Sequence, residues 1–269
     1  MQTIADYELL RSLGYGSHGQ FFLARTPARL PVNAEFVAVK VFAGESSSDM
    51  FRRATRELTA FAKVSSPHVV SLYDAGLHDG VFYYSMEYLP GGSLASPAQP
   101  APPAAAVRAV QHAALGVAAM HAAGIAHRSV KPANILLGAS GAKLSDLGLA
   151  HVLTPGVTLT AMGPVGSLEY VDPELLQGAA TTTATDLWSL GVTLHRVLSG
   201  RGIYGSDLPA DDGLLAVRRI VTTAPQIAAG LPPRAADLIA ACIGPAEGRP
   251  SASEFAGELD AMPLPAAAG

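Results

Sequence analysis

Several residue types in this chain stand at spacings that suit phosphate and metal chemistry. The segment Gly14–Gly19 (GYGSHG) concentrates glycine, which lets backbone N–H groups approach a polyphosphate without side chains in the way. Lys40 lies on an alternating apolar segment, and Lys131 and Asn134 lie close together further on. A lone glycine-rich turn is equally typical of an ordinary hairpin, so the interpretation depends on the order of all such segments along the chain.

That order is specific. The segments run as follows: Gly14–Gly19, Val37–Lys40, Glu57, His127–Ser129, Lys131–Asn134, Asp146–Gly148, Asp172–Glu174, Asp186–Gly191 and Gly248–Pro250. The series resembles the protein kinase superfamily over nearly the whole chain, and most closely its compact bacterial Ser/Thr branch. The resemblance implies a bilobal α+β protein kinase fold. Its N-lobe holds a small antiparallel sheet plus one helix, and its C-lobe is mainly helical.

The resemblance also implies ATP and Mg²⁺ as cofactors. Backbone N–H groups around Gly14, Gly16 and Gly19 would approach the phosphates. Lys40 would pair with the α- and β-phosphates, held by Glu57. The remaining implied residues are Asn134 and Asp146 as Mg²⁺ ligands, Lys131 at the transferred phosphoryl group, Met86 as gatekeeper, the Glu87 carbonyl and Leu89 N–H at the adenine edge, and Ala38 and Leu136 on the two faces of the ring.

Other matching residues have structural roles in the family. The resemblance implies that His127 braces the loop around it and that Asp186 ties a helix to the same loop. It further implies that Arg249 pairs with the Glu of Asp172–Glu174. Arg128 would face a phosphorylated residue, for which Thr158 and Thr160 are the candidates.

The main departure is Ser129, which occupies the position of the catalytic aspartate. That carboxylate accepts the hydrogen bond of the substrate hydroxyl and orients its attack. A serine hydroxyl is neutral near pH 7 and cannot act as the corresponding base, and losing such a group typically costs about 10²- to 10⁴-fold in rate.

Four smaller departures accompany it. Phe21 replaces a valine that covers the adenine and is bulky enough to fill part of the nucleotide pocket. Leu147 replaces the phenylalanine of the metal-binding triplet, and Ser167 replaces a threonine that contacts the catalytic aspartate and lysine. Asp172 replaces a small apolar residue for no reason that the sequence reveals.

We interpret the chain as a pseudokinase, a signalling or scaffold module that binds Mg–ATP or no ligand and acts through an unidentified protein partner. Three alternatives stay open. One is a weakly active Ser/Thr protein kinase that transfers the ATP γ-phosphoryl group to protein Ser/Thr, because charge neutralisation matters more than the base in a loose transition state. The others are nucleotidyl transfer and an engineered change at Ser129.

The elements that must position these residues follow from the apolar spacing. Expected strands are Tyr7–Leu13, Gln20–Arg25, Phe36–Phe42, Val69–Asp74 and Val81–Tyr88; expected helices are Ser48–Phe61, Ala104–Ala123, Ala184–Leu198, Pro233–Cys242 and Ser251–Ala261. We expect residues 1–88 to form the N-lobe, 89–94 the hinge, 95–261 the C-lobe and 262–269 a tail or linker. Residues 95–103 are too rich in proline for the long helix that the family forms beside its substrate cleft.

Composition narrows the class of protein and the kinds of partner that the chain can have. With 49% hydrophobic and 15% charged residues, the 269-residue chain is no disordered segment. A net charge of −4 does not favour nucleic acid as a partner. Cys242 is the single cysteine, which excludes an intrachain disulfide. The longest apolar run, Ala113–Ala126, is too short for a membrane segment, so we expect a cytoplasmic protein or the cytoplasmic domain of a longer, membrane-anchored one.

Overall fold

The computed structural model of the chain describes residues 2–16, 19–44, 47–147, 149, 165–205, 208–209 and 212–263. The chain divides into two compact units. Unit 1 comprises residues 1–63, 70–89 and 148–163, and unit 2 comprises 64–69, 90–147 and 164–269. Residues 64–69 thus belong to unit 2 although unit 1 flanks them on both sides in the sequence.

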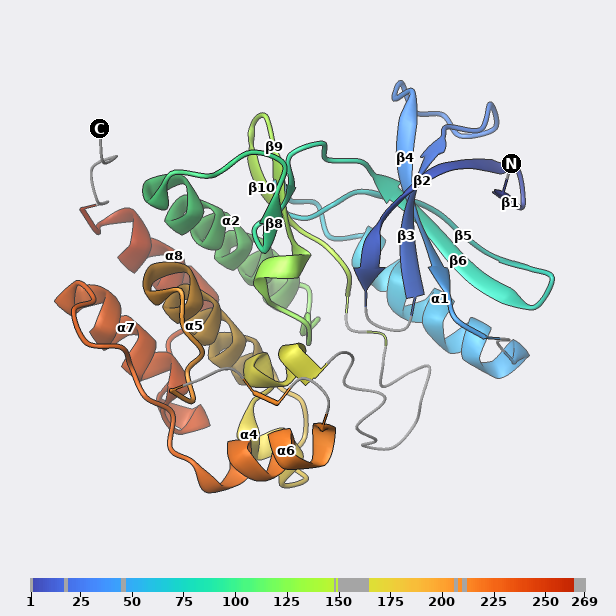
Figure 1. Cartoon of the computed structure of the whole chain (residues 1–269). Coiled ribbons are helices and arrows are strands. Elements are labelled where there is room, and N and C mark those ends of the chain that lie inside the picture. Colours follow the sequence, from blue (N-terminus) through green and yellow to red (C-terminus); the bar gives the residue numbers. More distant parts are fainter. Residues whose placement is uncertain are drawn as a thin grey trace. The chain divides into compact units, whose positions relative to one another are not determined.

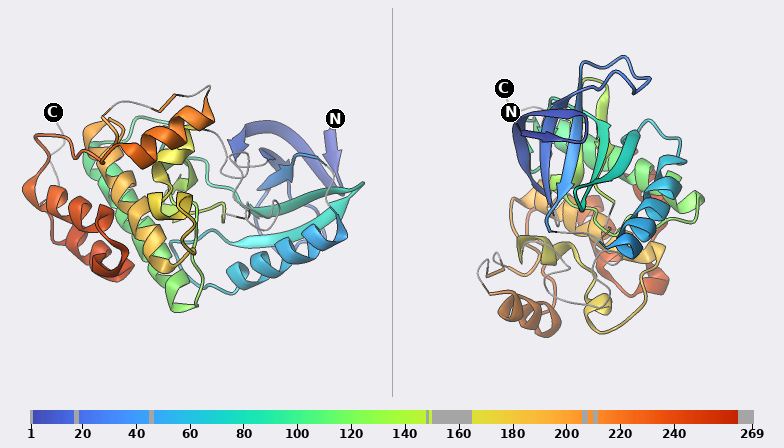
Figure 2. Two further views of the ribbon diagram at one scale, coloured as in Figure 1. Left: turned by 90° about the horizontal axis from the view of Figure 1, so that it is seen from below. Right: turned by 90° about the vertical axis from the view of Figure 1, so that its right-hand side faces the viewer.

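Unit 1 is built on an antiparallel sheet with the strand order β1-β2-β3-β4-β6-β5 (Figure 1). The strands are β1 (Gln2–Ile4), β2 (Tyr7–Gly16), β3 (Gly19–Arg25), β4 (Phe36–Phe42), β5 (Leu72–His78) and β6 (Val81–Glu87). Helix α1 (Ser48–Ala62) packs beside β5 (Figure 2). Strand β4 alternates between faces: Val37 and Val39 join the apolar core around Tyr7, so Ala38 and Lys40 face the other way.

The expected helix at residues 48–61 is confirmed, because Ala54, Leu58 and Phe61 are buried on one face. The Ser47 side chain caps it by accepting a hydrogen bond from the Met50 N–H at 3.2 Å. Strand β1 was not expected, since three residues give too short a pattern.

The expected strand Val69–Asp74 is placed wrongly, because β5 begins at Leu72 and extends to His78. Val69 belongs to unit 2 and forms a parallel bridge with Leu144. The apolar pair Val69–Val70 is buried without being part of β5, and apolar spacing alone does not distinguish these two situations.

Unit 2 is mainly helical, as expected. Its α-helices are α2 (Pro103–Ala122), α4 (Pro173–Leu176), α5 (Thr183–Ser199), α6 (Gly213–Thr222), α7 (Pro233–Ile243) and α8 (Ala252–Asp260), with 3-10 turns η1 (Pro132–Asn134), η3 (Val165–Tyr170) and η4 (Ala246–Gly248). α5 packs against both α2 and α7, and α2 against α8. Eleven α5 residues are buried, so this helix is central to the unit.

Unit 2 also holds a four-stranded sheet that the apolar spacing did not indicate. Its order is β10 (Gly141–Leu144), β9 (Ile135–Gly138), β7 (Gly92–Ser93) and β8 (Ser96–Pro97). The proline-rich segment contributes the unexpected strand β8, whereas its composition had predicted only that it would not form a long helix. Together, the antiparallel sheet with one helix and the helical unit confirm the expected α+β fold class.

Two further findings concern the reactivity of the cysteine thiol and the possibility of a membrane-spanning helix. Cys242 is buried on α7, and burial raises the pKa of its thiol to about 12, so it carries no reactive thiolate near neutral pH. Within the described ranges, the helices fall short of the length and apolar character needed to cross a bilayer.

Candidate functional site

The glycine-rich turn joins β2 to β3, and its residues Ser17 and His18 lie outside the described part of the chain. Gly14 has a φ of +124°, a conformation that favours glycine, where the pairing of β2 with β3 is irregular. A Cβ atom on Gly19 would collide with the Val41 carbonyl oxygen of β4. Gly16 pairs with Gly19 across the turn. Glycine is thus required at positions 14 and 19 by the backbone itself.

Lys40 lies on β4 directly opposite Phe21 of β3, with only 2% of its surface exposed. Its Nζ is 5.0 Å from the centroid of the Phe21 ring and 4.9 Å from that of Phe42. A lysine ammonium at this distance from a ring is attracted by the negative face of the π-system. Glu57 lies partly buried on α1, and its pairing with Lys40 stays a prediction.

The expected adenine contacts in unit 1 lie on β4, on β6 and just after it. Ala38 is opposite Met86 across the two strands, and both are buried. The Glu87 N–H donates to the Ser71 carbonyl at 2.9 Å, and the Glu87 carboxylate accepts from the Ser71 N–H at 2.7 Å. Leu89 is buried and is the last residue of the unit 1 segment 70–89. Two hydrogen bonds therefore hold the backbone before Leu89 in place.

Ser129 and Asn134 in unit 2 are joined side chain to side chain. The Asn134 amide donates to two oxygens of Ser129, since Nδ2 lies 2.9 Å from Ser129 Oγ and 2.7 Å from the Ser129 carbonyl oxygen. Because the amide is planar, these bonds turn Oδ1 of Asn134 away from Ser129. The serine hydroxyl is therefore an acceptor that orients the amide of a predicted metal ligand.

Asp186 organises the backbone around Ser129, as the resemblance implied. This fully buried carboxylate accepts hydrogen bonds from the N–H groups of His127 and Arg128, each at 2.7 Å, and lies 2.8 Å from Nε2 of His121. Arg128 has a φ of +68°, which costs energy for a residue other than glycine. The paired N–H groups offset that strain and fix the loop ahead of Ser129.

His127 has a bracing role, confirming the expectation. Its Nε2 lies 3.1 Å from the Ser145 carbonyl oxygen, and its Nδ1 accepts from the Ser129 N–H at 3.3 Å. Complete burial lowers the pKa of the imidazole, so it is neutral near pH 7, with its proton on Nε2. In this form the ring joins Ser129 to the residue just before Asp146.

Lys131 is held by the residue whose family counterpart is a threonine. Its Nζ donates to Ser167 Oγ at 2.9 Å, and Lys131 is buried. Ser167 lies on η3, so this turn fixes the ammonium group. The loss of a methyl group at position 167 has therefore not removed the contact to the lysine.

Asn134 and Asp146, the predicted metal ligands, carry side-chain oxygen atoms of the kind that Mg²⁺ prefers. Asp146 is buried, with a φ of +59°. Both the N–H and the hydroxyl of Ser145 donate to the Asn134 carbonyl, at 2.8 and 3.1 Å, which ties the two segments together. Among the described residues, no three His, Cys, Asp or Glu side chains gather as a metal site. The predicted donors are one amide and one carboxylate. This donor set fits an ion that keeps water and phosphate oxygens as its other ligands.

The β9–β10 hairpin carries Asn134 just before it and Asp146 just after it. Leu136, the expected lower contact of the adenine ring, lies on β9 opposite Lys143. The hairpin is held from the side: Ala142 N–H donates to His112 Nδ1 of α2 at 3.0 Å. The rings of His68 and His112 are in contact, tilted by 33° with centroids 4.5 Å apart, and the His68 carbonyl accepts from the Leu144 N–H at 2.8 Å. This histidine pair therefore supports the strand that leads to Asp146.

The histidine pair predicts a loss of stability at acid pH. Desolvation, His68 and Arg108 lower the pKa of His112, so the folded protein favours the neutral ring. This preference stabilises the fold fully above about pH 6.5, and the stabilisation is lost as the pH falls below that value. Protonating Nδ1 also breaks the bond from Ala142, at a cost of about 1 kcal/mol. His112→Asn, which keeps an acceptor but does not titrate, should lose less stability than the wild type between pH 7.5 and 5.5 in urea unfolding.

The control is His78→Asn, since the His78 side chain is 43% exposed. This variant should keep the wild-type pH dependence. Burial also lowers the pKa values of His127 and His195, so every variant loses some stability in acid. The contribution of His112 is therefore the difference between variants in the slope of the free energy of unfolding against pH. Equal slopes for His112→Asn and the wild type would contradict the prediction.

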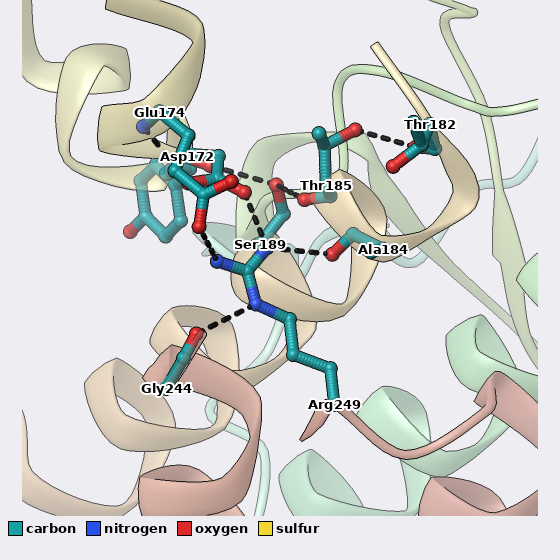
Figure 3. A network of polar contacts seen from close by, with 9 residues as sticks. Asp172, Glu174, Thr182, Ala184, Thr185, Ser189, Gly244 and Arg249 are labelled. Atoms are coloured by element: carbon teal, nitrogen blue, oxygen red, sulfur yellow. Dashed lines mark hydrogen bonds and ion pairs between the residues drawn. The ribbon is translucent and has the colours of Figure 1, made fainter. Parts of the chain in front are cut away.

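Arg249 is the centre of a buried polar network in unit 2 (Figure 3). Its guanidinium pairs with Asp172, and the exposed fractions of these two side chains are 2% and 1%. It also donates to the carbonyls of Gly244 and Ala184, each at 2.9 Å. The Glu174 carboxylate is 3.4 Å away and 46% exposed. The expected partner Glu174 is therefore only the outer one, and Asp172 forms the close pair.

Asp172 has a second task, because its carboxylate caps α4 by accepting from the Glu174 N–H at 3.1 Å. The unusual residue thus has a structural reason that sequence reasoning missed. A signal was present: an acidic residue directly before Pro-Glu is a helix N-cap pattern. The candidates Thr158 and Thr160 and the glycine at 148 lie outside the described residues.

The comparisons with known proteins agree with the order of the motifs. Residues 7–257 match the protein kinase domain family. The chain is 36% identical over 208 residues to the serine/threonine-protein kinase PknD of Mycobacterium tuberculosis, which covers 75% of this chain and 31% of that protein. It is 31% identical over 201 residues to PrkC of Bacillus subtilis, covering 72% and 30%.

A probable serine/threonine-protein kinase of Clostridium perfringens is 31% identical over 262 residues, covering 94% of this chain and 38% of that protein. The chain thus spans about a third of the length of these relatives. Because the family match runs through both units, the chain belongs to the protein kinase superfamily, among relatives of the bacterial serine/threonine kinases.

Proposed function

We propose that this protein is a pseudokinase that binds Mg–ATP and acts as a signalling or scaffold module. The observation that carries the proposal is Ser129, whose hydroxyl accepts a hydrogen bond from the Asn134 amide in place of a catalytic carboxylate. A hydroxyl that is neutral near pH 7 cannot take up the substrate proton as a carboxylate does. The same hydroxyl supports the residue proposed to hold the metal, so transfer is impaired while binding is kept.

The groups proposed to bind the nucleotide are retained. Asn134 and Asp146 would hold Mg²⁺, which supplies charge neutralisation at the β- and γ-phosphates. Lys40, held by Glu57, would contact the α- and β-phosphates, and Gly14, Gly16 and Gly19 would offer backbone N–H groups. The adenine contacts would be Phe21, Ala38, Met86, Glu87, Leu89 and Leu136.

A second candidate function is weak Ser/Thr protein kinase activity. It is favoured by the hydrogen bond between Lys131 and Ser167, because Lys131 is the residue proposed to neutralise the transferred group. A loose transition state depends more on such charge than on a base. This candidate requires transfer of label from ATP to protein Ser/Thr that Asp146→Asn abolishes.

The location and partners are proposed from the relatives. These are named serine/threonine-protein kinases, and the chain matches about a third of each. We place this domain in the cytoplasm, where ATP is available, with a protein partner in a signalling pathway and no nucleic acid. It would work either alone or as the cytoplasmic domain of a longer, membrane-anchored protein.

Nucleotide-dependent stability tests the proposed function. ATP with Mg²⁺ at 100 times its Kd should stabilise the fold by about 2.7 kcal/mol, and ATP without Mg²⁺ should stabilise it less. Asp146→Asn should remove the Mg²⁺-dependent part. The measurement is thermal unfolding together with calorimetric titration. Absence of any shift in both conditions would contradict nucleotide binding and leave only a nucleotide-free scaffold.

The matched control is Asp79→Asn. Asp79 and Asp146 both have left-handed backbones, with φ of +48° and +59°, so the backbone tolerates Asn equally at both. Asp79 is 92% exposed and has no proposed role in metal binding. It should behave as the wild type. A loss of the Mg²⁺ effect in this variant would show that the assay reports something other than the proposed ligand.

A further inference from the structure

Lys40 lies between two aromatic rings of its own sheet. Phe21 is its partner across β3 and β4, and Phe42 lies two residues on along β4, on the same face. The ring centroids are 5.0 and 4.9 Å from Nζ, well within the range of a cation–π contact. Both rings therefore contact the cation that the proposed function assigns to the phosphates.

The two rings differ in how firmly they are held. Phe42 is buried and stacks on Phe82 at 4.9 Å, and Phe82 meets Phe51 of α1 edge to face at 5.7 Å. Phe21 is only partly buried, and its neighbour across β2 is Gly14, where the strand pairing is irregular. The Phe42 ring is therefore held in place by its neighbours, and the Phe21 ring is the one that can move.

We propose that Phe21 sets the affinity of the nucleotide site for phosphate: its ring covers one side of the Lys40 ammonium, and a nucleotide phosphate must displace it. This inference rests on the proposed nucleotide binding. A phosphate oxygen needs hydrogen-bond contact with Nζ, so the ring that shields this atom opposes its binding. The sequence suggested instead that Phe21 fills space beside the adenine. Displacement from Lys40 differs from that effect, because it penalises phosphates and spares the nucleoside.

The experiment compares adenosine, ADP and ATP by calorimetric titration with Mg²⁺, in the wild type, Phe21→Val and Phe21→Leu. Leu keeps most of the volume but has no π-face. If the ring competes for Lys40, both variants should bind ADP and ATP about 2- to 30-fold more tightly than the wild type. Adenosine should change less than about twofold. If Phe21 instead fills the adenine pocket, Val tightens all three ligands equally and Leu does not, which would overturn the proposal.

Phe36→Leu is the control. Phe36 lies at the other end of β4, where its ring meets Arg25 at 5.9 Å, so this variant loses a phenylalanine and a cation–π contact remote from Lys40 in sequence. Its affinities for all three ligands should equal those of the wild type. Improved ATP binding in this variant would show that loosening the sheet, and not uncovering Lys40, is responsible.

A ligand-free measurement checks the contact itself. The ε-CH₂ signals of Lys40 in a ¹H–¹³C spectrum should be shifted upfield by the ring currents, and Phe21→Leu should reduce that shift. An unshifted Lys40 in the wild type would overturn the proposal. If wild type and variants bind ATP equally, the Phe21 inference fails alone; if no variant binds any nucleotide, the proposed function fails with it.

Discussion

Asp172→Asn is expected to lower the free energy of unfolding by about 3–5 kcal/mol, because it leaves the buried Arg249 cation without its close counter-charge. The two side chains are almost fully buried, and the guanidinium also lies over the Trp188 ring at 5.5 Å. Glu174→Gln should cost less than about 1 kcal/mol, since that carboxylate is half exposed and further away. Urea unfolding of both variants measures the difference.

The order of the two costs is the decisive outcome. If Glu174→Gln were the more damaging change, the arginine would depend on the glutamate as the resemblance implied, and Asp172 would be a minor partner. Should Asp172→Asn fail to fold, the double variant with Arg249→Met keeps the test open. Removing both charges should recover part of the stability, because the penalty comes from one unpaired buried charge.

Ser129→Asp is expected to raise phosphoryl transfer by about 10²- to 10⁴-fold over the wild type, the usual contribution of a positioned acid–base group. The surrounding contacts favour recovery: Asp186 already fixes the loop backbone, and Lys131 is held by Ser167. Transfer of radioactive phosphate from ATP to the protein or to a generic substrate measures the gain.

The control is Ser129→Asn, which offers a side-chain oxygen to Asn134 but no base, and it should stay at the wild-type rate. Adding Asp146→Asn to the aspartate variant should abolish the gain. If Ser129→Asp binds Mg–ATP but transfers nothing, the explanation by a single residue is wrong. The change at position 172 and the proline-rich segment around β8 would then also limit activity.

The sequence predicts best those elements that a single pattern determines. Helix α1 has a strong periodicity of 3.6 and strand β4 is a nearly continuous apolar run, and both were predicted within a residue or two. The prediction failed at β5, where the apolar pair Val69–Val70 is buried for another reason. It also missed β7–β10 and α6, because two- to four-residue strands are too short for a pattern and α6 exposes Leu214 and Leu215.

The residues of the candidate site also differ in how far their roles could be predicted from the sequence. The resemblance implied the roles of Asp186 and His127, and the hydrogen bonds of both residues agree with those roles. The contacts of Asp172, Phe21 and His112 could not be predicted, since each depends on a partner from a distant segment: Arg249, Lys40 and Ala142. Linear spacing does not report such pairs, and only the register of β3 on β4 brings Phe21 opposite Lys40.

The assignment of residues 64–69 to unit 2 has a consequence for how the chain folds during synthesis. Val69 bridges to Leu144, and Gly116 of α2 is needed where a side chain would strike the His68 carbonyl. The ribosome releases α1 and β5 before both partners, and Leu144 emerges some 75 residues after Val69, so the bridge between them forms only late in translation. Proteases should therefore cleave a nascent fragment ending at Leu89 within residues 64–69. A fragment that includes Leu144 should resist cleavage there.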